Sequence, residues 1–374
     1  VDGDFIKLDT KPSDDNNVTW TSPDNGSIAD MNTEDANYQV SGTATSVSGT
    51  VAANGYIYFR IGLTSVNENN SPPRYGRILL SYNGNSKQQF LYIRQGEEAD
   101  YVFRKEDTYG SSSTAREKAV KFSPYNLTAP ELPDGSPYYK DIDVNGGEFV
   151  DYPTQMGAFF QFANNTNKRR AYHPITDNFS SVWNNTYNDL AYYWESSPTA
   201  LKTDHETCPV NWRRPNDGIT DNAQGISSNG NIAVSEMRQS LYAVPKEGVI
   251  SMTENTGCAW GYYADGYFDR RAIVSSVGVN NVSKSAVSVS TKDAAYIGTL
   301  FFNSTNGNRS LFAPAGGARV GNIGSLYYSG NYGFYWSSSS NSYETGWHLG
   351  FKKGVADQSS DTRSYGCAVR CVKE

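Results

Sequence analysis

The first quarter of the chain alternates short apolar and aromatic runs with polar turn clusters. Residues 55–63, 75–82 and 89–94 are rich in Tyr, Phe, Ile and Leu, and Asn83-Gly84-Asn85 separates the last two runs. Runs of this length and composition predict strands, and an Asn-Gly pair between two of them predicts a hairpin turn. We therefore expect residues 1–97 to form a small antiparallel β-sandwich.

From Tyr101 onward the pattern changes to long loops rich in Tyr, Asn and Gly. Residues 231–242 predict a helix, because Val234, Met237 and Leu241 follow a spacing of three to four residues. The remaining apolar runs predict strands at 286–290, 296–302, 333–336, 347–351 and 368–372. Residues 98–374 are thus expected to form a second unit of α+β class.

Composition and charge narrow the class of protein. The 374 residues include 27 Tyr, 7 Trp and 34 Gly, and only 19% of them are charged, which is typical of a loop-rich extracellular β protein. The net charge of −7 disfavours binding to nucleic acid. No apolar run reaches the roughly 18 residues of a membrane span. Because the chain starts at Val1 without Met, we expect that a leader or a longer upstream segment has been removed.

The four cysteines raise the first question of chemistry. Cys367 and Cys371 lie four residues apart, and on a strand they would face the same way with about 13 Å between their Cα atoms. A disulfide needs a Cα separation of about 5.5 Å, so in a strand they cannot bond to each other. Each then needs another partner, and Cys208 and Cys258 are the remaining cysteines. An even count in an exported chain favours disulfides over free thiols or a metal site.

Metal and cofactor binding have little support. Zinc sites use paired C-x-x-C motifs or clustered histidines, whereas His173, His205 and His348 are scattered along the chain. We predict no metal and no cofactor.

Catalysis is also disfavoured. Asp265 and Asp269 could share a helical face as a carboxylate pair for glycoside hydrolysis. Asp269 stands beside Arg270 and Arg271, so a salt-bridged helix end is the favoured interpretation. No G-x-S-x-G motif and no phosphate-binding glycine loop occurs. We predict that the protein is not an enzyme, with no catalytic residue.

Aromatic residues offer the best candidate binding surface. Tyrosine rings with neighbouring polar groups suit sugars, which present apolar CH faces and hydroxyl rims. The alternative is core packing, which we expect for Trp212, Trp336 and Trp347 and which stays open for the tyrosines. The candidate ligand-binding residues are Tyr262, Tyr263, Asp265, Tyr267, Tyr328, Tyr332 and Tyr343.

Residues 74–82 (RYGRILLSY) and 91–96 (LYIRQG) resemble the last two strands of BACON-type immunoglobulin-like domains of Bacteroides-group surface proteins. This resemblance implies that residues 1–97 are an immunoglobulin-like spacer or a carbohydrate-associated module.

Five ordered motifs carry a second resemblance. They are CPVNWRRPN from Cys208, the predicted helix, LFAPAGGAR from Leu311, YWSSS from Tyr335 and RCV from Arg370. Together they are similar to the Fibrobacter major paralogous domain, except that Asn211 replaces the usual Gly. The resemblance implies a fold like that of C-type lectins and formylglycine-generating enzymes over residues 98–374. It also implies a Cys208–Cys371 disulfide, which leaves Cys258 for Cys367.

The resemblance also suggests a function. Calcium-dependent lectins carry an E-P-N or Q-P-D triplet, where this chain has Arg214-Pro215-Asn216, so calcium-independent recognition is expected. Residues 119–127 and 157–162 resemble versions of this domain in fimbrillin-type pilus proteins of gut Bacteroides.

That likeness implies an extracellular adhesin, at a pilus tip or on the outer membrane, that binds glycan or a host or bacterial surface protein. Two alternatives stay open. One is a structural pilus subunit without its own ligand that joins a neighbouring subunit by strand exchange. The other is a sugar-active or formylglycine-type enzyme.

Overall fold

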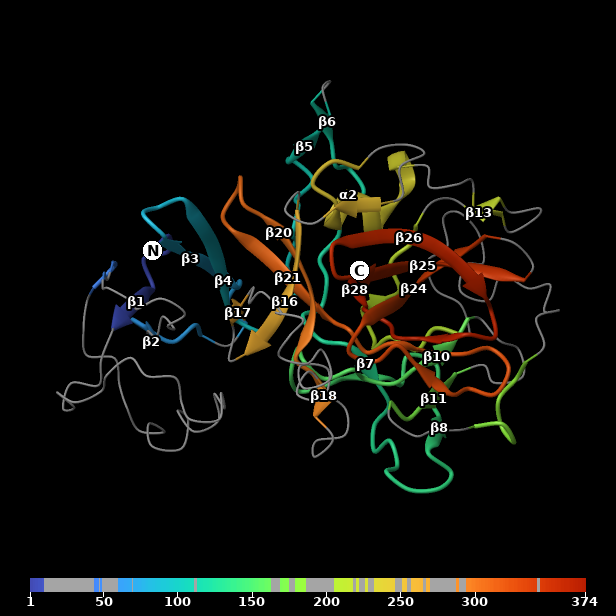
Figure 1. Ribbon diagram of the computed structural model, residues 1–374. Helices are drawn as coiled ribbons and strands as arrows, with labels where there is room; N and C mark the ends of the chain where they lie inside the picture. Colours follow the sequence, from blue (N-terminus) through green and yellow to red (C-terminus); the bar gives the residue numbers. More distant parts are fainter. Residues whose placement is uncertain are drawn as a thin grey trace.

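Strands dominate the computed structural model (Figure 1). It describes residues 1–9, 44–46, 48, 60–68, 70–110, 113–162, 169–174, 179–185, 205–217, 220–221, 226–227, 232–245, 251–253, 257–264, 267–269, 287–288, 294–341 and 344–374. Within these ranges the helical residues are the 3₁₀ turn η1 (Ile232–Val234) and the helix α2 (Glu236–Leu241). The predicted helix is therefore present but short, and the described part of the chain is mostly β.

The hairpin predicted near the N-terminus is confirmed. Strands β3 (Arg74–Tyr82) and β4 (Lys87–Gln95) pair antiparallel along their whole length. Asn83, Gly84 and Asn85 turn the chain with φ of 53°, 62° and 66°, values that Asn and Gly tolerate best. Beside the hairpin, β1 (Ile6–Asp9) pairs with β2 (Arg60–Leu63). Their apolar side chains share one small core, formed by Phe5, Ile6, Leu8, Ile78, Leu91 and Ile93.

The hairpin β3–β4 continues into a six-stranded sheet. Its order is β21 (Arg309–Pro314), β20 (Ile297–Asn303), β16 (Cys258–Ala264), β17 (Tyr267–Asp269), β4 and β3. Pairing of β17 with β4 brings Tyr267 opposite Ile93 and Phe268 opposite Tyr92. The sheet thus crosses the boundary that the sequence predicts after residue 97, so the two predicted units share backbone hydrogen bonds.

Apolar side chains are packed on both faces of this sheet. One face carries a continuous aromatic cluster that includes Tyr92, Leu300 and Phe312 and reaches from β4 to β21. The other face contributes Leu91 and Ile93 to the N-terminal core at one end, and residues of β16, β20 and β21 to the main core at the other. Strands β3 and β21 also approach each other, so the sheet is curled around the aromatic cluster.

The main core separates this sheet from a four-stranded sheet, of which the three strands nearest the C-terminus are drawn in red in Figure 1. Its order is β15 (Ser251–Thr253), β26 (Val355–Thr362), β25 (Thr345–Lys352) and β24 (Tyr332–Ser340). A smaller sheet beside it has the order β10 (Phe160–Gln161), β27 (Gly366–Cys367), β22 (Ala318–Arg319) and β23 (Leu326–Tyr327). Trp336 and Trp347 are buried and Trp212 is half-buried, as expected for core residues.

Short antiparallel pairs complete the architecture. They are β5 (Thr108–Tyr109) with β6 (Thr114–Ala115), β7 (Leu127–Thr128) with β9 (Glu148–Phe149), β8 (Tyr139–Asp141) with β11 (Arg170–Tyr172), β12 (Trp212–Arg213) with β28 (Val372–Lys373), β13 (Thr220–Asp221) with β14 (Ile226–Ser227), and β18 (Val287–Ser288) with β19 (Ala294–Ala295).

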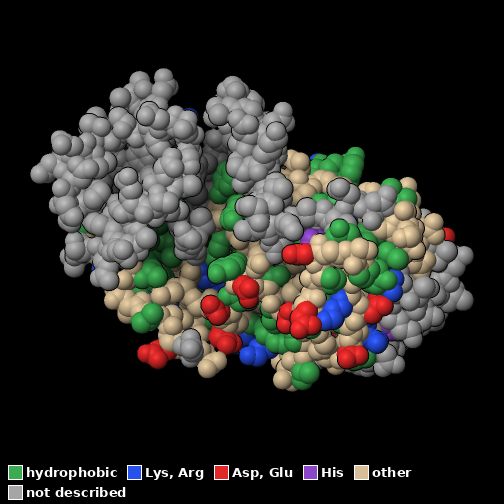
Figure 2. All heavy atoms as spheres, turned by 90° about the horizontal axis from the view of Figure 1, so that it is seen from below, with side chains coloured by type: hydrophobic (Ala, Val, Ile, Leu, Met, Phe, Trp, Pro, Cys, Tyr) green, Lys and Arg blue, Asp and Glu red, His purple; other side chains and the backbone are tan. Residues whose placement is uncertain are grey.

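The surface mixes both signs of charge. On the face drawn in Figure 2, acidic and basic side chains lie interspersed among apolar and neutral groups rather than in one large patch of a single sign. In the part of the chain that the structure describes, no helix has the length and apolar character required to cross a bilayer.

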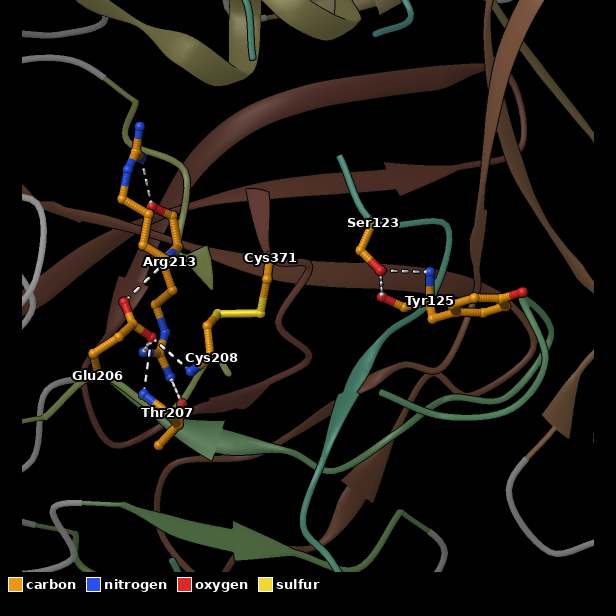
Figure 3. Close-up of a disulfide and its surroundings, with 8 residues drawn as sticks. Ser123, Tyr125, Glu206, Thr207, Cys208, Arg213 and Cys371 are labelled. Atoms are coloured by element: carbon orange, nitrogen blue, oxygen red, sulfur yellow. Dashed lines mark hydrogen bonds and ion pairs between the residues drawn. A yellow bond between two sulfur atoms is a disulfide. The ribbon is translucent and has the colours of Figure 1, made fainter. Parts of the chain in front are cut away.

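A disulfide joins Cys208 to Cys371 across 163 residues, with a Cα separation of 6.0 Å (Figure 3). Beside it, β12 pairs with β28, so the bond joins the middle of the chain to its last strand. The buried carboxylate of Glu206 accepts hydrogen bonds of 2.8 Å from the backbone N–H groups of Thr207 and Cys208. It also accepts one of 2.6 Å from Arg214. The expected Cys208–Cys371 pair is confirmed.

The second expected disulfide, Cys258 with Cys367, is wrong. Neither residue forms a disulfide, and both are buried. Cys258 lies on β16 in the main core, whereas Cys367 lies on β27 in a separate cluster with Phe162 and Trp336. The expected strand over residues 368–372 is also interrupted, because only its last residue belongs to a strand, β28.

The disulfide should contribute much of the stability. Closing a loop of 163 residues restricts the unfolded chain, and the chain-entropy model assigns about 5 kcal/mol to a loop of this size. We expect the C208A/C371A double variant to lose free energy of unfolding of that order in denaturant titrations. Thiol titration of unreduced, denatured wild-type protein should find two thiols, and finding none would contradict the absence of a disulfide at Cys258 and Cys367.

The shared sheet should make unfolding cooperative. Because β4 and β17 are paired, separating the N-terminal hairpin would expose the aromatic cluster that both regions bury. We expect calorimetry of the full chain to show one transition, and we expect F312A, which truncates a ring of that cluster, to shift the whole of it. Two resolved transitions, with only the later one moved by F312A, would show that the regions unfold independently.

Candidate functional site

The most promising surface is the side of the four-stranded sheet that faces away from the main core. Leu349, Phe351 and Ala356 point into the main core, and side chains alternate along a strand. The neighbouring residues of β24, β25 and β26 therefore face the other way. We call this side the outer face, although at Trp336 it packs against Phe162 and Cys367 and is buried. It carries Tyr332, Phe334 and Trp336 on β24, His348, Gly350 and Lys352 on β25, and Asp357, Ser359 and Asp361 on β26.

Four aromatic rings form a continuous row at the edge of the outer face. Ring centroids are 3.9 Å apart for Tyr327–Tyr328, 4.6 Å for Tyr328–Tyr332 and 5.8 Å for Tyr332–Phe334. Tyr327 and Tyr328 are 50% and 45% exposed, whereas Tyr332 and Phe334 are half-buried. We call this row the aromatic ladder. It is a surface on which a flat apolar ligand can stack.

The backbone between β23 and β24 sets the order of these rings. Tyr328 adopts φ of 60°, and its carbonyl accepts hydrogen bonds from the N–H groups of Asn331 and Tyr332 at 2.9 and 3.0 Å. The tight turn places Tyr328 above Tyr332. Gly330, at φ of 78°, has a conformation that favours glycine.

One cation borders the aromatic ladder. The Lys352 ammonium lies 5.3 Å from the Tyr332 ring centroid and donates to the Tyr332 hydroxyl at 3.5 Å. This geometry is that of a cation–π contact at an exposed site. Lys352 thereby adds a hydrogen-bond donor to the rim of the aromatic surface.

Gly350 lies in the middle of the outer face and is buried. Gly350 on β25 pairs with Phe334 on β24 and with Asp357 on β26, so the three residues lie side by side across the sheet. Between the Phe334 and Asp357 side chains, Gly350 contributes none. At the position where a Cβ of residue 350 would stand, Asp357 Oδ1 is 2.9 Å away and His348 Nε2 is 3.5 Å away. The Phe334 ring centroid lies 5.5 Å from that of His348. A side chain at residue 350 would be too close to the Asp357 carboxylate, so the position is tightly packed, and we call it the Gly350 notch. It brings an acid, an imidazole and an aromatic ring together.

Burial changes the titration of these groups. It lowers the pKa of His348 to about 3, so the ring is neutral at physiological pH. Partial burial raises the pKa of Asp361 to about 6, and it raises the pKa of Asp357 against the opposing charge of Lys352. Asp361 Oδ2 lies 3.7 Å from His348 Nε2, beyond hydrogen-bonding distance.

Four of the tyrosines predicted to bind ligand lie in two separate parts of the structure. Tyr328 and Tyr332 meet in the aromatic ladder, as described above. Tyr262 and Tyr263 lie on β16 in the six-stranded sheet, where Tyr262 packs on the main core and Tyr263 stacks on Phe312 with ring centroids 4.8 Å apart. The core-packing alternative therefore describes these two tyrosines.

Other predicted residues have little or no structural description. Asp265 and Tyr343 lie outside the described residues, and of Tyr267 only the backbone position on β17 is described. The helix end expected at Asp269 is wrong, because residues 267–269 form the strand β17.

The sequence did not single out Phe334, His348, Lys352 or Asp357. Because side chains alternate between the two faces of a strand, the sequence shows which residues within β24, β25 or β26 share a face. It does not show the register in which these strands pair. That register places Gly350 between an aromatic ring and a carboxylate.

The buried imidazole predicts acid sensitivity. In the unfolded chain a histidine titrates near 6.5, so the unfolded state takes up this proton before the folded state does. Stability should fall as pH drops from 6.5 towards 3, by up to about 1.4 kcal/mol per pH unit from this group. We expect H348Q to show a shallower loss of stability than the wild type in denaturant titrations over this range.

Asp361 acts in the opposite direction. Because its folded pKa of about 6 lies above 3.8, the ordinary pKa of an aspartate side chain, its protonation favours the folded state as pH falls through this interval. Measuring H348Q in the D361N background removes that contribution. Equal pH slopes for D361N and D361N/H348Q would contradict a neutral, buried His348.

Residues 123–372 match the model of a family described as a domain of unknown function (DUF8237). No curated protein and no solved structure matches the chain. The matched range includes Cys208, Cys371, the aromatic ladder and the Gly350 notch, and it covers more than half of the chain. The chain therefore belongs to the DUF8237 family.

Proposed function

We propose that the protein is a carbohydrate-binding protein of the cell exterior and that the aromatic ladder is its glycan platform. The observation that carries this proposal is the unbroken contact of Tyr327, Tyr328, Tyr332 and Phe334 at the surface. Tyrosine is amphipathic, so its ring can cover the CH face of a sugar while its hydroxyl bonds to the rim. Contiguous exposed aromatic surface commonly marks a binding site.

Polar groups near the ladder suit the hydroxyls of a sugar. Lys352 offers N–H donors, whereas Asp357 and Ser359 offer oxygen acceptors on the same outer face. A small number of placed polar groups beside apolar surface is typical of small-molecule sites. Binding by such a surface involves no covalent chemistry, which agrees with the proposal of a non-enzymatic protein.

Recognition is proposed to be calcium-independent. Arg214 occupies the place at which calcium-dependent lectins carry an acidic or amide residue, and its side chain is 1% exposed in an ion pair with Glu206. We therefore assign a structural role to Arg214. Among the described residues, no group of three or more His, Cys, Asp or Glu is arranged to hold a metal ion.

The cellular setting is part of the same proposal. A structural disulfide supports an oxidising, extracellular location, because such bonds are rare in reducing compartments. The pairing of β12 with β28 beside that bond supports a C-type-lectin-like closure of the C-terminal region. We propose that an immunoglobulin-like N-terminal part presents this region at a bacterial surface or pilus tip as an adhesin.

Loss of a ladder ring should weaken glycan binding. A stacked ring contributes roughly 1 to 1.5 kcal/mol, so Y328A and Y332A should each weaken binding by about tenfold. The measurement is a glycan array with the full chain, followed by calorimetry with the best ligand. Y152A is the matched control, because Tyr152 is 66% exposed and lies on a loop outside the ladder. Equal losses in Y152A and Y328A, or no glycan bound at all, would contradict the proposal.

A further inference from the structure

We infer that a polar cleft beside β3 and β21 is a second binding site, which takes a small ligand that carries a single anionic group. The cleft has a volume of about 600 Å³, within the range of small-molecule sites. Its walls come from the start of β3, the loop that follows β4, and the turn between β20 and β21. None of these residues belongs to the aromatic ladder, so the inference does not depend on the proposed glycan platform.

The cleft is open, and its two sides are held together. At Gly307, in the turn between β20 and β21, nothing apart from the two chain neighbours lies within 4 Å of the position that a Cβ would take. The next residue, Asn308, donates a hydrogen bond of 2.8 Å to Asp2, and Asp2 pairs with Arg77 on β3 at 3.2 Å. A ligand can therefore enter a space whose walls are fixed to each other.

Two of the three carboxylates in the wall are already bonded. Asp107 accepts four hydrogen bonds of 2.7 to 3.1 Å, one of them from Arg309, its partner in a buried ion pair. Burial raises the pKa of Tyr75 to about 12, so its hydroxyl stays protonated and bonds to Asp100. These two acids have little remaining capacity to attract a ligand cation.

Two arginines in the wall are less well matched by acids. Arg74 donates to Gln95 Oε1 at 2.6 Å and to Ser65, and it forms no ion pair with any described residue. Arg104 has one ion pair in the described structure, with Glu106 at 3.9 Å, and these side chains are 49% and 70% exposed. Exposed pairs of this kind contribute little. The cleft thus holds two cations that lack a strong anionic partner.

The chemistry of arginine indicates the ligand. A planar guanidinium can donate two parallel hydrogen bonds to the oxygens of one anionic group, which suits a carboxylate or a sulfate ester. The three carboxylates in the wall limit the negative charge that the cleft can accept, because each further charge on the ligand is repelled by them. A single anionic group therefore fits best, and Arg104 and Arg74 are expected to bind it.

Three hexoses that differ only at C6 test the inference by calorimetry with the full chain. They are glucuronate, glucose 6-sulfate and glucose. We expect the two acids to bind at least about tenfold more tightly than glucose. R104Q should weaken binding of the acids about three- to tenfold, because it removes a charge-assisted donor. E106Q should strengthen it about two- to threefold, because it removes an anion that competes for Arg104.

The controls separate the cleft from its surroundings. K105Q removes the same charge as R104Q from the neighbouring exposed residue, which does not line the cleft, and should change the affinity less than about twofold. Y328A should leave the preference for the acids unchanged. E106Q keeps the inference testable if R104Q proves unstable, and thermal melts establish that each variant is folded.

The outcomes distinguish this inference from the proposed function. Binding of only one of the two acids supports the inference and identifies the anion. Acids that bind no more tightly than glucose, or more weakly in E106Q, would overturn it. A preference lost in Y328A and unchanged in R104Q would also overturn it, by placing the anion at the aromatic ladder. A silent glycan array, with the cleft binding acids as expected, would overturn the glycan platform alone.

Discussion

The C-terminal segment, residues 366–372, is the part on which the rest of the structure depends, because it is buried and makes contacts on several sides. The disulfide fixes Cys371, and the Cys371 carbonyl accepts a hydrogen bond of 3.0 Å from the Ser123 N–H. Ala368 exchanges two hydrogen bonds of 3.0 Å with β24, at Phe334 and Trp336. The strand that carries half of the aromatic ladder is thus aligned by the segment that the disulfide anchors.

Two buried ion pairs connect the segment after Cys208 to the helix α2. Arg213 binds Glu236 on α2 at 2.7 Å, and Arg238 on α2 binds Asp217 at 2.9 Å. Both members of each pair are buried, so the net gain in stability is small, but loss of one partner would leave an uncompensated charge. Such pairs therefore favour one arrangement of β12 and α2 over others.

Local patterns predicted local structure well. The Asn83-Gly84-Asn85 turn and the helix at α2 followed from residue type and spacing, and resemblance to a family selected the Cys208–Cys371 pair. The predicted disulfide between Cys258 and Cys367 was wrong, because an even number of cysteines does not show that two of them are neighbours. These two lie in different buried clusters. The ladder was found only in part: loop tyrosines are visible in sequence, whereas the Gly350 notch depends on the register of three strands, and nothing in a single sequence encodes that register locally.

The central claim is that a sugar stacks on the aromatic ladder of the outer face. The most direct measurement is a crystal structure of the full chain with the tightest-binding oligosaccharide from the glycan array. The account predicts sugar rings against Tyr328 and Tyr332, with polar contacts to Lys352 or Asp357. A ligand seated elsewhere, with the rings of Tyr328 and Tyr332 uncovered, would contradict it.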